Sequence, residues 1–273
     1  MMRKLDHLAP VEDLSGAWCD ANSVTSSLME AISFIAPVLE KFFIRTVAEA
    51  LAGQQDPDLD RRCRAFIREE AVHSHMHRRL NASLLKYLCT MPPGFAMVQS
   101  LLNGARQHLP LSFRLLLATS LEHFAAVLSK GYLNQEAQWD FRCAFTKELF
   151  AQHAREELAH RSVVFDLWLS QGKTGRVGRT LIVLTILLAG LAYVSAAVPW
   201  ILHHKTGKRL TGTLSAFAGF VMRKRLNITN GSSLRELFLF ACGDYHPECL
   251  IAKGATAGIE QSPLSITKES QCF

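Results

Sequence analysis

The segment that decides the fold reads His153-Ala154-Arg155-Glu156-Glu157-Leu158-Ala159-His160. Residues three, four and seven apart share one face of an α-helix, so His153, Glu157 and His160 form a single stripe. Glu157 and His160 make a Glu-x-x-His motif, which lets one helix direct a carboxylate and an imidazole toward a common point inside a bundle. On its own, such a motif is more often a solvated surface pair than a metal site.

The same pattern occurs earlier in the chain. Glu70 and His73 form a second Glu-x-x-His, and His77 follows one turn later on the same stripe. Two such helices can supply a pair of metal ions when they face each other in one bundle. The repetition therefore favours a metal centre over two unrelated surface pairs.

Each motif contains two adjacent glutamates, and the sequence leaves open which of them is the ligand. Glu69 competes with Glu70, and Glu156 competes with Glu157, because residues four apart also share a helix face. The continuous stripe with the histidine one turn away favours Glu70 and Glu157.

Two further carboxylates stand in apolar surroundings. Glu40 lies between Val38-Leu39 and Phe42-Phe43-Ile44, and Glu122 lies within an apolar run from Leu115 to Leu128. An unpaired carboxylate is costly to bury, so buried charges persist where they are paired or bind a metal. The predicted metal ligands are Glu40, Glu70, His73, Glu122, Glu157 and His160.

Carboxylate oxygen and imidazole nitrogen suit iron or manganese, and also zinc. We expect two iron ions, with manganese or zinc as alternatives. His77 and His153 lie one turn from the predicted ligands, and we assign them as catalytic residues that carry protons, with an extra ligand or a hydrogen-bonded supporting residue as alternatives. His75 and His123 point elsewhere in the helical register, so we expect them to be core, surface or supporting groups.

Four long helical regions are expected. Their ranges are Pro37 to Leu51, Asp58 as N-cap to Leu84, Phe95 to Ser129 with a break at Pro110, and Gln138 to Leu169. Pro37 is expected in the first turn of its helix, and Gly131 is expected to close the third region. β-branched residues never alternate with polar ones over five positions, so we expect no strand. The predicted class is all-α, a ferritin-like four-helix bundle with an additional hydrophobic helix and a short helical C-terminal region.

The residues from Thr180 to Leu202 form an uncharged stretch of 23 residues. About twenty apolar residues cross a bilayer core, and basic residues flank both ends of this stretch. We expect a single membrane span, with a buried fifth helix as the alternative. Leu214 to Met222 is a candidate for a second, shallower apolar element.

We expect the chain to be organised as a flexible N-terminal arm (1–22), a metal-binding four-helix bundle (23–172), a hydrophobic, transmembrane-like helix (173–209), and a C-terminal helical segment with a mobile tail (210–273).

Composition narrows the class of protein. The 273-residue chain is 49% hydrophobic and carries a net charge of +6 with scattered basic residues and no nucleic-acid motif, so we expect no nucleic-acid partner. Seven cysteines without a Cys-x-x-Cys pair indicate reduced thiols. The first thirty residues lack a signal-peptide pattern. We therefore expect the bundle at the cytoplasmic face of the inner membrane, with a cytoplasmic location as the alternative.

Several segments resemble a bacterial family of predicted metal-dependent hydrolases. The similar stretches are Ala36 to Phe43, Phe66 to His73 with His77 and Asn81, His153 to His160 with Phe165-Asp166, and Tyr245-His246-Pro247. The chain departs from the family pattern in having Glu69 where Gln is usual, and Phe150 or Ala151 near where Trp is common. These departures leave the predicted ligands intact. The family name implies hydrolysis, although the ligand set is closer to that of ferritin-like oxidases and oxygenases.

The leading functional expectation is an oxygen-activating di-iron oxidase or oxygenase that takes dioxygen and a small or hydrophobic substrate. The first alternative is a metal-dependent hydrolase that activates water. The second is a non-catalytic metal-storage or membrane-scaffold protein. We also consider a homodimer as the assembly.

Overall fold

The computed structural model describes residues 14, 16–135, 138–171, 175–222, 231–243 and 245–249. Within these residues the secondary structure is helical, without a strand, and the one isolated β-bridge joins Cys19 to Phe141. The prediction of an all-α protein is confirmed for the described part of the chain. The expected mobile tail beyond about Lys253 lies outside the described residues.

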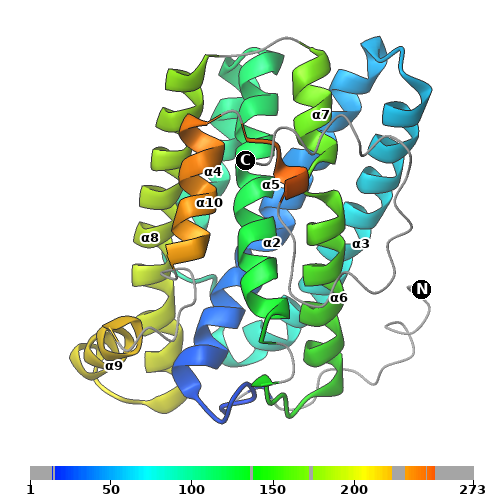
Figure 1. Cartoon of the computed structure of the whole chain (residues 1–273). Coiled ribbons are helices and arrows are strands. Elements are labelled where there is room, and N and C mark those ends of the chain that lie inside the picture. The colour runs from blue at the N-terminus through cyan, green and yellow to red at the C-terminus, as the bar shows by residue number, and fades with distance from the viewer. Residues whose placement is uncertain are drawn as a thin grey trace.

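Four helices make a ring that surrounds the centre of the molecule (Figure 1). They are α2 (Ser23–Ala50), α3 (Pro57–Leu88), α5 (Leu111–Leu133) and α6 (Ala144–His160). Helix α2 contacts α3, α3 contacts α6, α6 contacts α5, and α5 contacts α2. All six predicted ligands come from these four helices.

Shorter helices and one long helix cover the ring. They are η1 (Leu51–Gly53), α4 (Phe95–His108), α7 (Val163–Ser170), α8 (Arg176–Thr206), α9 (Leu210–Met222), α10 (Gly231–Cys242) and η4 (Pro247–Cys249). Helix α8 packs against α2, α5 and α10 along one side of the ring. The buried hydrophobic residues accordingly extend from the ring into its contacts with α8.

Helix α2 begins fourteen residues before the expected start. Asn22 caps it, because its side-chain oxygen accepts hydrogen bonds from the backbone N–H groups of Val24 and Thr25 at 2.9 and 3.2 Å. Pro37 therefore lies inside the helix, where it cannot donate to the carbonyl oxygen of Ser33. Asn81 of α3 satisfies that oxygen instead, since its Nδ2 donates to it at 2.9 Å.

Helix α3 also begins earlier than expected. Asp56, and not Asp58, is the N-cap, since its carboxylate accepts from the backbone N–H groups of Asp58 and Leu59. Pro57 occupies the first helical position, where its missing N–H has no cost. The helix continues to Leu88.

The break at Pro110 is confirmed, because α4 ends at His108 and α5 begins at Leu111. The expected closure at Gly131 is wrong, since α5 runs through this residue to Leu133. The backbone of Gly131 does not adopt the left-handed conformation that glycine often has at helix ends, so Gly131 is an ordinary helical residue here.

The expected single helix from Gln138 to Leu169 is wrong at its start and in its middle, whereas its expected end lies within one residue of the end of α7 at Ser170. Residues 139–143 are not helical, and their backbone pairs with the lead-in: the N–H of Arg142 donates to the carbonyl of Trp18 at 2.9 Å. The helix then breaks after His160, where Arg161 turns its guanidinium back to donate to the carbonyl of Leu158.

The residues just before α2 were expected to belong to a flexible arm, but those that the structure describes are packed against the bundle. Leu14, Trp18 and Cys19 are buried, and Trp18 donates its indole N–H to Glu30 at 2.6 Å. The preceding residues 1–13 lie outside the described part.

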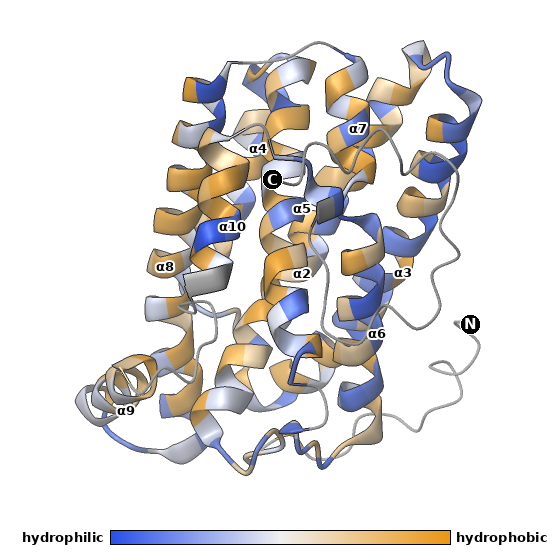
Figure 2. Cartoon of the chain, in the orientation of Figure 1, coloured by the Kyte–Doolittle hydropathy of each residue, from blue (hydrophilic) through white to orange (hydrophobic). Residues whose placement is uncertain are grey.

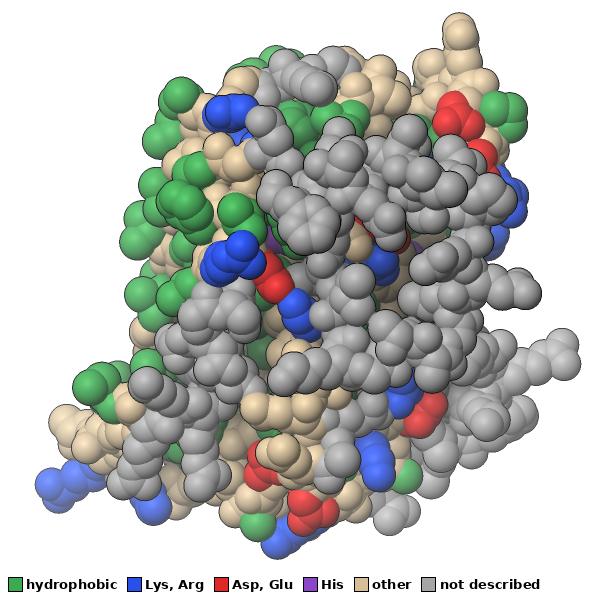
Figure 3. All heavy atoms as spheres, viewed as in Figure 1, with side chains coloured by type: hydrophobic (Ala, Val, Ile, Leu, Met, Phe, Trp, Pro, Cys, Tyr) green, Lys and Arg blue, Asp and Glu red, His purple; other side chains and the backbone are tan. Residues whose placement is uncertain are grey.

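Two described helices are long and apolar enough to cross a membrane, by length and composition alone. They differ in burial, because 56% of the apolar window of α5 is buried but only 28% of that of α8. Figure 2 shows α8 as hydrophobic over most of its length, and Figure 3 shows hydrophobic side chains along that edge of the molecule. The opposite face of α8 is packed on the bundle: Tyr193 donates to the carbonyl of Ala31 at 2.8 Å, and Lys205 pairs with Glu30 at 2.5 Å.

Candidate metal centre

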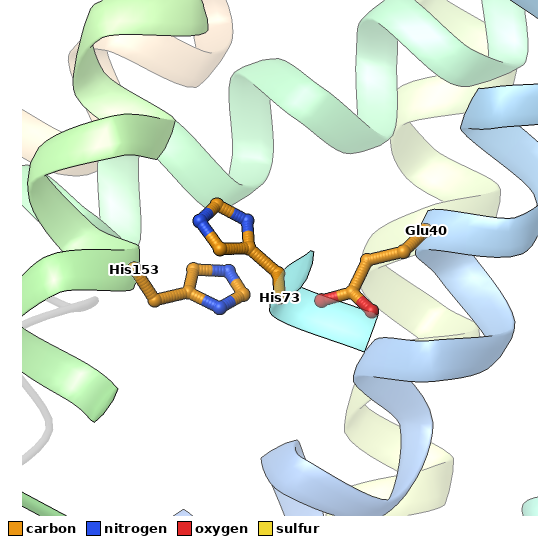
Figure 4. Close-up of side chains that lie close together, drawn as sticks. All are labelled: Glu40, His73 and His153. Carbon is orange, nitrogen blue, oxygen red and sulfur yellow. The ribbon is translucent and has the colours of Figure 1, made fainter. Parts of the chain in front are cut away.

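The structure brings all six predicted ligands together in the middle of the ring. Together with His153, they form three overlapping groups, and within each group the ligand atoms lie within 4.8 Å of one another: Glu40 with His73 and His153, Glu70 with His73 and Glu157, and Glu70 with Glu122 and His160. Glu70 and His73 each belong to two of the groups. Figure 4 shows the first group, with Glu40 on α2, His73 on α3 and His153 on α6 directed into one space. The six predicted ligands are buried, and His153 is partly exposed.

The carboxylates of this cluster have few partners within the protein. Both side-chain oxygens of Glu40, Glu70 and Glu122 are buried without a hydrogen bond, as is Oε2 of Glu157. Unpaired buried polar groups are rare in proteins, and each carries a desolvation cost. Four carboxylates in one dry space also repel one another. Both problems are removed when a cation is bound among them.

The two histidines of the Glu-x-x-His motifs are held from behind by the other helix. Nε2 of His73 contacts Glu156, and Nε2 of His160 lies 2.5 Å from Glu69. The Nδ1 atoms therefore face the cluster, 3.4 and 3.5 Å from Oε1 of Glu70, and neither makes a hydrogen bond. A carboxylate on the outer nitrogen is the usual support for a metal-binding histidine, since it fixes the ring and its tautomer.

This arrangement distinguishes the two members of each glutamate pair, which the sequence left open. Glu70 and Glu157 enter the cluster, whereas Glu69 and Glu156 lie outside it and hold the histidines. Glu69, one of the departures from the resemblance noted in the sequence, thus provides a carboxylate that contacts His160.

The burial of so many acidic groups changes their pKa values. Burial raises the pKa of Glu40 well above its usual range, and the negative charge of Glu70 raises it further. Burial also raises the pKa of Glu122 well above its usual range, with Glu157 and Glu70 adding to the effect. Without a cation, the cluster therefore holds protons on some of its carboxyl groups.

The carboxylate in the middle behaves differently. Burial opposes the ionisation of Glu70, but attraction to the imidazoles of His160 and His73 outweighs it and lowers its pKa to about 2. Burial likewise opposes protonation of His160, yet Glu69 and Glu70 raise its pKa to about 9. Glu70 is therefore ionised at neutral pH and lies between the two histidines.

A chain of hydrogen bonds leads away from the cluster along one side. His153 places Nε2 3.0 Å from Oε1 of Glu157 and Nδ1 2.9 Å from Nε2 of His77. On its other side, Nδ1 of His77 lies 2.9 Å from Oγ of Ser33, which donates to Oδ1 of Asn81 at 2.8 Å. Burial, together with the neighbouring histidines, lowers the pKa of His77 well below its usual range, so its ring is neutral.

Ser33 was not predicted, and its link to His77 depends on the packing of α2 against α3. One signal for it is present in the sequence, because Ser33 stands four residues before Pro37 and its carbonyl must lack the usual helical partner. The other two histidines behave as expected: His75 is exposed, and His123 is buried with its ring stacked 4.3 Å from that of Phe240.

Two distant segments of the family pattern meet at one end of the bundle. Nε2 of His246 lies 2.9 Å from Oδ1 of Asp166, and Arg62 of α3 donates to the other oxygen of the same carboxylate at 2.9 Å. Phe165 packs edge-on against His246 at 5.0 Å. These contacts tie residues 245–249 to α3 and α7.

The donor set fits a cluster of one or two divalent ions. It offers four carboxylates and two imidazole Nδ1 atoms, with hard oxygen ligands in the majority, and iron, manganese and zinc all accept such a mixture. The unpaired buried atoms are those that ligation would satisfy, which is the observation that favours a metal over a purely structural polar core.

A sequence model for a family described as predicted metal-dependent hydrolase matches residues 2–249. The matched range includes the whole cluster, its supporting glutamates and the His246 contact. No curated protein and no solved structure matches the chain.

Proposed function

The chain belongs to the family of predicted metal-dependent hydrolases, and from that premise we propose that it hydrolyses its substrate with two metal ions held by the central cluster. The proposed ligands are Glu40, Glu70, His73, Glu122, Glu157 and His160. The observation that carries the proposal is the set of buried oxygen and nitrogen atoms that converge there without hydrogen-bond partners. His73 belongs to the first and second of the three groups and Glu70 to the second and third, so these two residues link all three groups.

When bound, such ions lower the pKa of a coordinated water and polarise an ester, amide or phosphoryl group. The protein supplies the remaining parts. Glu69 and Glu156 fix the rings of His160 and His73, so that Nδ1 of each histidine stays directed at the site.

We assign proton transfer to His153 and His77. His153 bridges Glu157 and His77 with its two nitrogens, and it is the partly exposed member of the chain. His77, kept neutral by burial, accepts or returns a proton at Nε2 while Ser33 holds its other nitrogen. The pair therefore provides a route by which a proton leaves the site without moving a ligand.

Metal analysis tests the central claim. The wild-type protein should be purified beside Glu122→Gln, which keeps the shape of the side chain and removes its charge, and Glu148→Gln on the outer part of α6 as a matched control. We expect close to two ions per chain in the wild type and the control, and a clear loss in Glu122→Gln. Equal metal content in all three proteins would contradict the proposal.

An oxygen-activating di-iron enzyme is the second candidate. The observation that favours it is the donor set itself, because a Glu from each of two helices and a Glu-x-x-His from each of the other two is the pattern of ferritin-like di-iron carboxylate proteins. Hydrolysis of model esters and phosphate esters under anaerobic conditions with zinc or manganese separates the candidates. Oxygen consumption by the iron-loaded protein with a reductant, without such hydrolysis, would favour the oxidase.

We further propose that α8 contacts a membrane and that the substrate is hydrophobic. The exposed side chains of its outer face are uncharged and apolar over four turns: Val177, Leu181, Leu184, Leu188 and Leu191. Because the inner face packs on the bundle, a contact along the membrane surface fits this helix better than a lone span. Flotation with phospholipid vesicles tests it, and Leu184→Glu with Leu188→Glu should abolish binding.

A further inference from the structure

A groove lies between α2, α3 and α4, on the outside of the ring. Its cavity has a volume of about 230 Å³. The residues that line it are Pro37, Val38, Lys41, Phe42, Arg45, Arg78, Gln99, Leu102, Asn103 and Arg106. Lys41 and Arg45 follow one another at a spacing of four residues on α2, so the two cations share a helix face. Asn103 and Arg106 share a face of α4 in the same way.

The charge of this groove is unbalanced. Four of its lining residues are cationic and none is acidic. Among the described residues, the side chains of Lys41, Arg45 and Arg106 make no hydrogen bond or salt bridge, while Arg78 donates to Oγ of Ser74 at 2.6 Å. Cations that gather around one cavity repel each other unless an anion is placed among them.

Arginines elsewhere on α3 and on α5 are paired, which makes the contrast informative. Arg64 pairs with Asp60 at 2.7 Å on the outside of α3. Glu49, whose pKa Arg106 helps to lower, is committed to Arg114 through two hydrogen bonds of 2.6 Å. Glu49 therefore interacts with Arg106 only through its charge, its hydrogen bonds go to Arg114, and no acidic residue lines the groove.

We propose that the groove binds a phosphate-bearing anion. The guanidinium group presents paired N–H donors that match two oxygens of a phosphate, and lysine adds a point charge. The side-chain amides of Gln99 and Asn103 can donate to further oxygens. The buried side chains of Phe42 and Leu102 give the cavity an apolar floor, so the anion can carry a small apolar group. The site is separate from the metal cluster, whose ligands face the interior of the ring.

Isothermal titration of the full-length chain with inorganic phosphate tests the proposal, in chloride buffer of constant ionic strength. The test variant is Arg45→Gln with Arg106→Gln, and the control is Lys147→Gln, an exposed cation on α6. We expect saturable binding that is weakened at least about tenfold in the test variant and unchanged in the control. Metal content and thermal unfolding should be the same in all proteins, and the two single variants serve if the double variant melts early.

A second arm identifies the source of the phosphate. Vesicles of phosphatidylcholine with and without phosphatidic acid are mixed with each protein and floated. If phosphatidic acid recruits the wild type and the control but not the test variant, the anion is a lipid headgroup. If free phosphate binding alone depends on Arg45 and Arg106, the ligand is a soluble phosphate compound. The proposal is overturned if the test variant equals the wild type in both arms.

Discussion

Replacing Glu122 by methionine should make the metal-free protein more stable and remove its response to metal. The side chain is 1% exposed, and both of its oxygens are buried without a hydrogen bond. Its neighbours Glu40, Glu70 and Glu157 add repulsion. Methionine has a similar length and no polar oxygen, so it removes these costs while filling much of the same space.

The magnitude follows from the two unpaired oxygens. Each buried unsatisfied polar group costs about 1–3 kcal/mol, so their removal should raise the free energy of unfolding of the metal-free protein by about 2 kcal/mol or more. For a chain of this size that is a rise of about 4 °C in Tm. Metal at a thousand times its Kd stabilises the wild type by about 4.1 kcal/mol, which reverses the order of the two proteins when the gain from the substitution is near its lower value of about 2 kcal/mol.

Thermal unfolding followed by circular dichroism measures this reversal, with the protein stripped by a chelator and then titrated with zinc, manganese or iron. Glu148→Met on the outer part of α6 is the control, and it should shift the free energy of unfolding by no more than about 0.5 kcal/mol and keep the full metal response. The reasoning is refuted if metal-free Glu122→Met melts at or below the wild-type temperature while metal stabilises both proteins equally.

Three further predictions test the surroundings of the site. Glu69→Gln and Glu156→Gln should each weaken metal binding about 10- to 100-fold, because each removes the carboxylate that holds a histidine ring in place. Competition titrations with a chelating dye measure the affinity. An unchanged affinity would show that these contacts do not orient the ligands. Burial raises the pKa of Glu122, and Glu69 helps raise the pKa of His160 to about 9, so a binding metal ion must displace protons from these groups. The affinity for the metal should therefore rise about tenfold per pH unit, for each proton displaced, as the pH increases through neutrality. A metal affinity that does not depend on pH would contradict this prediction. Asn81→Leu should lower the free energy of unfolding, measured in urea, by about 2 kcal/mol, because it leaves the carbonyl of Ser33 unpaired. Adding Pro37→Ala should recover part of this loss, because residue 37 then has an N–H that can donate to that carbonyl. Additive effects of the two substitutions would refute the coupling.

The sequence determined the all-helical class of the fold and singled out the Glu and His residues that the structure brings together. Helical periodicity places Glu70 with His73, and Glu157 with His160, on single stripes, and a charge such as Glu122 in an apolar run has to be satisfied in the interior. These inferences depend on spacing along one helix, which local geometry fixes. They therefore need no knowledge of how the helices pack.

Helix ends were less predictable because their signals compete. Pro37 resembles a first-turn proline, but its helix continues through it, since Asn81 on another helix satisfies the carbonyl that the proline leaves free. At the break after His160, the side chain of Arg161 donates both to the carbonyl of Leu158 and to the carboxylate of Glu248, which lies 87 residues away in the sequence. Neither outcome can be read from the neighbouring residues alone.

Only the tertiary structure decided which glutamate of each pair enters the site. Glu69 and Glu70 differ by about 100° around their helix, and both lie close enough to the stripe to serve. The position of α6 settles the choice, because His160 takes Glu69 as its outer partner and leaves Glu70 inside. The basic groove depends on packing in the same way, since its cations come from three helices and are scattered in the sequence. A sequence fixes what each helix face carries, whereas contacts between faces arise only when the helices pack together.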